Sequence, residues 1–243
     1  MAMRTSWDEE ASNWVKWTRT PDHDVFRYYA PSFFAGVVPP AHGLTLEIGC
    51  GEGRVARELA SRAHSVVAVD ASATLVHFAR DADAQSAYLS GDATALPFGD
   101  GAFQTVVAYN SLQTTALLAD MAQAVREAGR VLKPSGHFCL CVAHPMTDVS
   151  LVKSLSLDGD LAASGSYFEH QQVNETVTKG SLEMTFHGWT YTLEDYARAL
   201  EAAGFVVDLV REPRPSAEQA AKRPSLERWR RIPLFLFMRA VKR

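Results

Sequence analysis

Three closely spaced glycines with nearby acids are the feature of this sequence best suited to chemistry. Gly49, Gly51 and Gly53 follow a short apolar stretch and precede residues with helical spacing. Glycines let a chain turn tightly and let a ligand approach the backbone amides. Glu47 lies just before the turn, and Asp70 ends the next apolar stretch. An acid in that second position can accept hydrogen bonds from a ribose diol, so the pattern predicts a nucleoside site.

The residues around the turn also indicate which kind of nucleoside is bound. Dinucleotide-binding turns follow the pattern G-x-G-x-x-G/A, and Arg54 stands here in place of the third glycine or alanine. The Glu47 carboxylate would repel a pyrophosphate and would attract a cationic amino group. Both features favour a nucleoside that carries an amino acid over NAD. A nicotinamide-dependent oxidoreductase is kept as an alternative.

Strand-like and helix-like patterns alternate along the chain, which is typical of a parallel α/β sheet. Strands are expected at residues 44–48, 65–69, 87–89, 103–109, 138–143, 205–210 and 233–241. Helices are expected at residues 54–61, 73–80, 117–131 and 193–203, with Ser72 and Thr192 as N-caps, and residues 133–136 are expected to form a turn. Ligands of such sheets bind at the carboxyl ends of the strands, so residues that follow strands are the site candidates.

Five stretches in this order resemble the motifs of the class I S-adenosylmethionine-dependent methyltransferases. They are residues 46–54, Asp70, residues 91–98, residues 130–136, and residues 191–196 with 203–205. The closest resemblance is to the small-molecule and quinone C-methyltransferase subgroup. It implies a Rossmann-like, mostly parallel seven-stranded sheet of order 3-2-1-4-5-7-6, with the last strand antiparallel and helices on both faces. It also implies S-adenosyl-L-methionine as cofactor, S-adenosyl-L-homocysteine as product, and an O, N or C atom of a small molecule as acceptor.

The resemblance and the strand-end rule together give a set of cofactor-binding residues. The set is Glu47, Gly49, Cys50, Gly51, Gly53, Asp70, Ala71, Ser72, Asp92, Ala93, Thr94, Asn110 and Ser111. In the family the acid at Asp70 holds the ribose, and the acid at Asp92 receives the adenine amino group. Simpler alternatives are a helix cap for Asp70 and a loop residue for Asp92. Cys50 is expected to fill space beneath the cofactor.

Candidates for the chemistry and for acceptor binding lie at the same edge of the predicted sheet. Histidine is the natural base near neutral pH if the acceptor must lose a proton. His144 ends a predicted strand and is the first candidate for a base or orienting donor; the alternative is that it caps the strand and bonds the backbone. His187 is the second candidate. Tyr29, Gln113, His144 and Tyr191 are expected to contact the acceptor.

The remaining segments suggest how the site is covered. Residues 1–40 are expected to form a helical cap, in which Trp7, Trp14 and Trp17 share one helix face. Such an aromatic cap suits an apolar or aromatic small acceptor. Residues 146–187 are expected to be an insert or lid that contains a hairpin around residues 179–180. Residues 41–145 form the cofactor-binding core, and residues 188–243 complete one domain.

Composition excludes several other classes of protein. The 243 residues include 24 Lys or Arg, 28 Asp or Glu and 47% apolar residues, enough for one large core in a single domain over 1–243. No run is long and apolar enough to predict a membrane span. Three cysteines and no ligand-type spacing predict a reduced, cytoplasmic, metal-free protein.

The expected partners follow from charge and from the residues after the fourth strand. The net charge of −4 makes nucleic acid an unlikely substrate, although residues 222–243 contain eight Lys or Arg. Residues 110–113 lack the prolines with which methyltransferases that act on nucleic-acid amines often hold their substrate. A protein or RNA methyltransferase and a non-catalytic binding protein for the cofactor remain alternatives. A homo-oligomer formed through residues 146–187 or the N-terminal helices is a further expectation.

Overall fold

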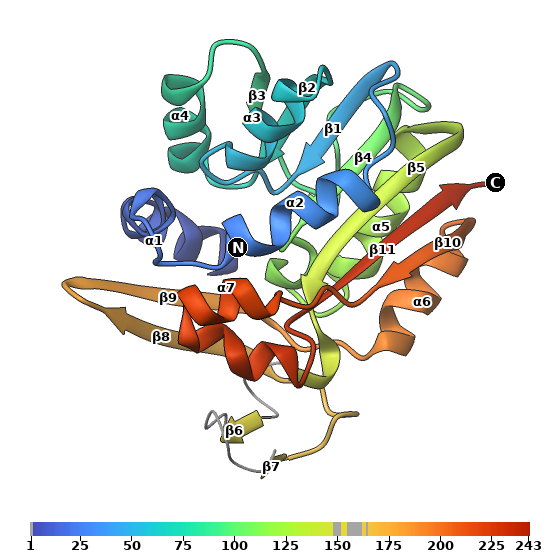
Figure 1. Ribbon diagram of the computed structural model, residues 1–243. Helices are drawn as coiled ribbons and strands as arrows, with labels where there is room; N and C mark the ends of the chain where they lie inside the picture. Colours follow the sequence, from blue (N-terminus) through green and yellow to red (C-terminus); the bar gives the residue numbers. More distant parts are fainter. Residues whose placement is uncertain (1, 148–151, 155–161, 164) are drawn as a thin grey trace.

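A computed structural model describes residues 2–147, 152–154, 162–163 and 165–243, with side chains for residues 7–147 and 165–243 (Figure 1). Part of the expected insert, residues 148–151, 155–161 and 164, lies outside the described residues.

Seven strands form one sheet in the order β3-β2-β1-β4-β5-β11-β10. They are β1 (Leu44–Ile48), β2 (Ser65–Asp70), β3 (Ala87–Ser90), β4 (Phe103–Tyr109), β5 (Leu132–Ala143), β10 (Phe205–Arg211) and β11 (Phe235–Lys242). Strand β11 runs antiparallel to both of its neighbours, and the other neighbouring pairs are parallel. The predicted order and the antiparallel last strand are therefore confirmed.

Helices cover both faces of the sheet and enclose two apolar clusters. The described α-helices are α1 (Ala2–Arg19), α2 (Phe26–Gly36), α3 (Arg54–Ser61), α4 (Ala73–Ala82), α5 (Asp120–Val131), α6 (Leu193–Ala202) and α7 (Ala217–Lys222), and α2 to α6 contribute to these clusters. Helices α5 and α6 pack on one face of the sheet, and α2, α3 and α4 pack on the other. None of the described helices has the length and apolarity needed to cross a membrane.

Strand alternation decides which side chains of β1 face each cluster. Leu46 and Ile48 belong to the cluster beneath α5, while Glu47 between them is also buried, at 1% exposure. Because successive side chains of a strand point to opposite faces, Glu47 faces the side of α3. The alternation of side chains along β1 therefore places Glu47 in the interior of the protein.

Three segments differ from the expectations. The expected turn at residues 133–136 is an irregularity inside β5, where pairing with β4 shifts and Ser135 has a φ of 61°. Helix α5 begins at Asp120, three residues later than expected, and residues 112–114 form a separate short helix, η1 (Leu112–Thr114). The polar segment after β10 contains α7 and the helix η3 (Pro224–Arg230).

The expected N-terminal cap is divided between two roles. Four residues of α2 are buried in the cluster that includes β4, β5 and β11, so α2 is a layer of the core. Helix α1 instead lies near the carboxyl ends of the strands, toward which the arrowhead of β1 points (Figure 1). Strands β8 (Gln172–Lys179) and β9 (Leu182–Trp189) pair antiparallel, which confirms the predicted hairpin. Helix α1 packs against β9 of this hairpin. The insert also contains η2 (Pro145–Thr147) and the short strands β6 (Val152–Ser154) and β7 (Ala162–Ala163).

Candidate functional site

The glycine turn joins β1 to α3, and two of its glycines cannot carry a side chain. Gly49 has a φ of 73°, and a Cβ there would lie 2.3 Å from the Cβ of Ser111. Gly53 has a φ of 87°, and a Cβ there would lie 2.8 Å from the Tyr88 hydroxyl. The Ser111 hydroxyl donates to the carbonyl of Ile48 at 2.6 Å. The ends of β1 and β4 therefore meet closely, as the expected cofactor site requires.

Asp70 connects the end of β2 to the glycine turn. Its Oδ2 accepts from the N–H of Gly51 at 2.8 Å, and its Oδ1 accepts from the N–H of Ser72 at 2.9 Å. Burial raises the pKa of Asp70, and these two backbone bonds oppose that shift. Each carboxylate oxygen has a further lone pair, so the group can still accept from the two hydroxyls of a ribose.

Glu47 is a buried acid whose hydrogen bonding is incomplete. Its Oε2 has no hydrogen-bond partner among the described residues. Burial raises the pKa of Glu47 well above its ordinary value, and the charge of Asp70 raises it further. A buried carboxylate oxygen without a partner is costly, and a cationic amino group at Oε2 would reduce that cost. The site thus fits a nucleoside that carries an ammonium group.

The loop after β3 has the geometry of a tight turn. Oδ1 of Asp92 accepts from the N–H of Thr94 at 2.8 Å and from its hydroxyl at 2.7 Å. Ala93 is partly buried against the cluster beneath α5, while Asp92 is exposed. This arrangement is compatible with the loop role of Asp92, and its contact with adenine stays a prediction.

The other predicted cofactor residues lie around the same turn. Cys50 is buried at 4% exposure, and Ala71 is half-buried between Asp70 and the start of α4. Asn110 has a φ of 54° and accepts from the Cys141 thiol at 3.5 Å. The turn after β4 is therefore held to β5 at the edge where a ligand would lie.

Helix α1 covers the glycine turn through contacts that the sequence did not indicate. A Cβ on Gly51 would lie 3.1 Å from the Nε1 of Trp14. The Asp8 carboxylate accepts from the Ser72 hydroxyl and, at 3.4 Å, from the N–H of Thr74. These partners lie more than 60 residues apart in the chain, so no local pattern could have identified Asp8.

Arg54 adds a second connection between the turn and the N-terminal segment. Its guanidinium lies 5.2 Å from the Trp14 ring centre and 4.3 Å from that of Phe26. It also forms an ion pair with Asp24, in the loop between α1 and α2. The residue that distinguishes this turn from a dinucleotide site is thus part of the contact with the cap.

His144 uses both ring nitrogens in contacts within the protein. Its Nδ1 accepts from the N–H of Met146 at 3.2 Å, so its Nε2 carries the proton and donates to Glu212 at 2.9 Å. The imidazole is buried, and burial lowers its pKa. The geometry favours the structural alternative, in which His144 is fixed at the end of β5.

His187 lies beneath α1, in β9. Its Nδ1 is 2.8 Å from Oδ1 of Asn174, and its ring meets that of Trp7 edge to face with centroids 6.2 Å apart. Its Nε2 has no hydrogen-bond partner in the part of the chain with described side chains. Gln113 lies against the same strand, with its Oε1 buried and unpartnered there.

The two tyrosines predicted to contact the acceptor lie in different places. Tyr29 is buried against Phe235 with ring centroids 5.0 Å apart, and its hydroxyl has no partner among the described residues. Tyr191 donates to the carbonyl of Leu118 at 3.1 Å. It lines a surface hollow of about 270 Å³ beside α5 and α6. Its hydroxyl is therefore committed to the core, which argues against the expected contact with the acceptor.

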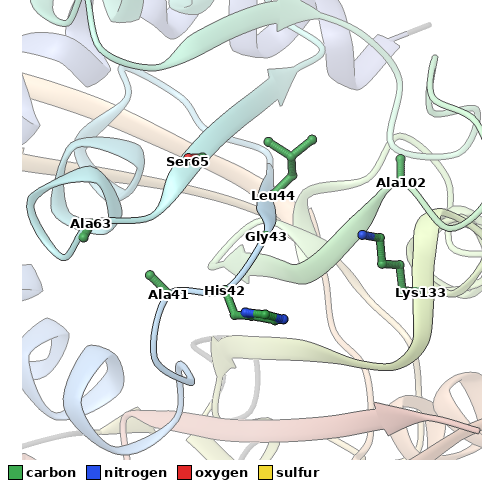
Figure 2. Close-up of a pocket in the computed structure, with 8 residues that line it drawn as sticks. All are labelled: Ala41, His42, Gly43, Leu44, Ala63, Ser65, Ala102 and Lys133. Carbon is green, nitrogen blue, oxygen red and sulfur yellow. The ribbon is translucent and has the colours of Figure 1, made fainter.

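A larger hollow of about 380 Å³ lies at the amino ends of the strands, opposite to the edge with the glycine turn. Figure 2 shows its lining, which includes Leu44 and Ser65, the first residues of β1 and β2. Because ligands of these sheets bind at the carboxyl ends, this hollow is not the candidate site. Within the described residues, no group of three His, Cys, Asp or Glu side chains could hold a metal ion.

Comparisons with known proteins agree with this geometry. Residues 46–140 match a family described as a methyltransferase domain. A malonyl-[acyl-carrier protein] O-methyltransferase from Erwinia pyrifoliae is 32% identical over 61% of this chain and 55% of its own length. A demethylmenaquinone methyltransferase from Roseiflexus castenholzii is 35% identical over 44% and 46%. The chain thus spans about half the length of these curated relatives.

The fold has the same architecture as solved methyltransferases. A crystal structure of an S-adenosylmethionine-dependent methyltransferase from Mesorhizobium loti aligns with a TM-score of 0.70 and 21% identity, over 88% of this chain and 98% of the other. Sheet order, glycine turn and acid at the end of β2 are those of a Rossmann-like domain. The sequence comparison points in the same direction: residues 46–140 match a methyltransferase domain, and the proteins to which the chain is similar are methyltransferases.

Proposed function

We propose that the protein transfers the methyl group of S-adenosylmethionine to a small, apolar or aromatic acceptor. The observation that carries this proposal is the carboxyl group of Glu47, which is buried beside a glycine turn and has its Oε2 unpartnered among the described residues. A dinucleotide would place its anionic pyrophosphate at the glycine turn, whereas the amino-acid part of S-adenosylmethionine carries an ammonium group. The family match independently supports the same cofactor.

The residues that would hold the cofactor follow from the geometry of the turn. Glu47 would bind the ammonium group, and Asp70 would accept from the ribose hydroxyls. Asp92 would contact the adenine. The cofactor supplies a methyl group already activated by sulfonium, so the protein needs mainly to align the acceptor and exclude water.

The acceptor class is inferred from the lining of the cap. Arg19 is paired with Glu52 and Arg54 with Asp24, so these cations beside the turn are already neutralised. Aromatic rings lie beneath and within α1: Trp7, Trp14, Trp17, Phe186 and His187. Paired cations and aromatic walls favour an uncharged ring over a free carboxylate. This class is closer to demethylmenaquinone than to malonyl-[acyl-carrier protein], the substrates in the relatives' names.

His187 is the better supported base if the acceptor must lose a proton. The contact with Asn174 fixes the proton on Nδ1 and leaves Nε2 able to accept one. The only ring lone pair of neutral His144 is on Nδ1, and it already accepts a hydrogen bond from the N–H of Met146. We therefore assign the proton-accepting role to His187.

Thermal unfolding with added ligands tests the proposed function. S-adenosylmethionine and S-adenosylhomocysteine at ~100 times their dissociation constants should each stabilise the chain by about 2.7 kcal/mol. That should raise the unfolding midpoint by several degrees, and NADH should not raise it. Glu47→Gln should reduce the shift, while Glu58→Gln, at a surface ion pair of α3, should not. A shift with NADH alone would contradict the proposal.

A further inference from the structure

The loop between α1 and α2, residues 20–25, is held by cations from distant parts of the chain. Arg223 lies just before η3, and its guanidinium donates to the carbonyls of Asp24 at 2.7 Å and Asp22 at 3.0 Å. Lys179, at the tip of the β8–β9 hairpin, donates to the carbonyls of His23, at 3.3 Å, and Asp22. Hydrogen bonds from charged donors are stronger than neutral ones. The loop carbonyls therefore join the hairpin tip to the segment before η3.

Further contacts hold the same loop. His23 returns a contact to the hairpin, with its Nε2 3.3 Å from the carbonyl of Lys179. Its ring meets that of Trp17 in α1 with centroids 5.3 Å apart. Asp24 pairs with Arg54 at the start of α3. The loop is thus bonded to the glycine-turn helix, to the hairpin and to the segment before η3.

Loop 20–25 joins two helices that are anchored differently. The described apolar cluster beneath α1 is small, with Ala11, Val15 and Leu75 buried and Trp14 and Phe78 partly buried against it. By contrast, α2 contributes Tyr29, Ala30, Phe33 and Phe34 to a cluster that spans the sheet. Polar contacts such as the Arg19–Glu52 ion pair hold α1 as well, and the loop adds to them at the carboxyl end of the helix.

The two cations would repel each other without the loop. Burial lowers the pKa of Lys179, and the charge of Arg223 lowers it further. Both cations donate to the carbonyl of Asp22, and the charges of the Asp22 and Asp24 carboxylates oppose the shift. The loop therefore supplies the groups that balance the two cations.

We propose that Arg223 and Lys179 are positioning residues for cofactor binding. They fix loop 20–25, and through it they hold α1 with Trp14 against Gly51. This inference rests on the proposed function only in its claim about the cofactor. Neither residue needs to touch the cofactor, so their effect is expected to pass through α1.

Hydrogen exchange of the full chain tests whether Arg223 holds α1. In Arg223→Ala, amides of α1 should exchange roughly tenfold faster, as expected for the loss of a charge-assisted hydrogen bond, while those of β1 and β4 stay unchanged. Arg223→Lys should restore part of the protection because an ammonium can still donate to one carbonyl. Lys222→Ala is the matched control, since Lys222 is exposed and pairs only with Glu218.

Binding of S-adenosylhomocysteine tests the consequence for the cofactor. Its dissociation constant should rise by a similar factor in Arg223→Ala and in Lys179→Ala, and Lys222→Ala should match the unmodified chain. Equal exchange of α1 in Arg223→Ala and Lys222→Ala would overturn the inference, and so would faster exchange with unchanged affinity. If Arg223→Ala does not fold, Lys179→Ala provides the same comparison, because Lys179 is a half-buried residue at the tip of a hairpin. If the unmodified chain binds no S-adenosylhomocysteine, the proposed function and the cofactor claim both fail, and exchange alone decides whether Arg223 holds α1.

Discussion

Carboxylates gather around the glycine turn. Glu47 is buried and Asp70 is half-buried, and burial raises the pKa of each. The charge of Asp8, from α1, raises the pKa of Asp70 further. Side chains that bear no net charge would make a more stable turn. The acids are therefore best explained by the ligand that they bind.

Substitutions of His187 and His144 should have different effects, because we assign a catalytic role to His187 and a structural role to His144. His187→Gln should lower the turnover of an acceptor that must lose a proton by roughly 10²–10⁴-fold, because a general base contributes about that much. It should leave the affinity for S-adenosylhomocysteine unchanged. His144→Gln should instead lower the unfolding midpoint, since it disturbs the contacts to Met146 and Glu212. Unchanged turnover in His187→Gln with a phenolic acceptor would exclude His187 as the base.

Local capping explains why many elements could be predicted. The Ser72 hydroxyl accepts from the N–H of Leu75 at 3.1 Å, as an N-cap does. Thr192 and Asp195 form a reciprocal capping box at the start of α6. By contrast, α5 begins three residues late, because the Asp120 carboxylate accepts from the N–H of Leu117 at 2.9 Å and forms a turn there. That choice between a turn and a helix is not visible in the spacing of apolar residues.

The contact of the β1 and β4 ends makes Gly49 a sensitive position. Gly49→Ala combines a left-handed backbone with a clash against Ser111, so it should destabilise the chain by roughly 2–4 kcal/mol. Urea unfolding would measure this loss. Gly99→Ala is the control, because a Cβ there meets nothing within 4 Å. Ser111→Gly should recover part of the loss in the double variant, and no recovery would show that the clash is not the cause.

Over the whole molecule, two apolar clusters fix the sheet while the site is covered by less firmly packed segments. Helices α2 to α6 enclose the clusters, whereas α1 and the β8–β9 hairpin meet through aromatic edges such as Trp14 with Phe186. Regions with few buried apolar contacts open most easily. The site thus lies between a rigid sheet and a cover that can open.

Buried acids should also make global stability depend on pH. A carboxyl whose pKa is raised by folding contributes most to stability below its unfolded pKa, about 4.3 for Glu, and loses that contribution as pH rises through the folded value. Glu47→Gln removes this term. The variant should therefore gain stability relative to the unmodified chain as pH rises from about 4 to 7, by roughly 1–3 kcal/mol at neutral pH. Urea unfolding at several pH values measures the difference, and a constant difference would refute the assignment to Glu47.

The sequence by itself determined the sheet, the glycine turn and the acids at its edges. These features depend on local patterns, since strand alternation, turn glycines and helix caps are set by neighbouring residues. Tertiary structure alone decided that α2 belongs to the core and α1 to the cover of the site. It also decided that both ring nitrogens of His144 have partners, whereas His187 has one at Nδ1 and none at Nε2 among the described residues. It also decided that Arg223 meets a loop about 200 residues away. Such contacts depend on how elements pack, and no spacing along the chain encodes them.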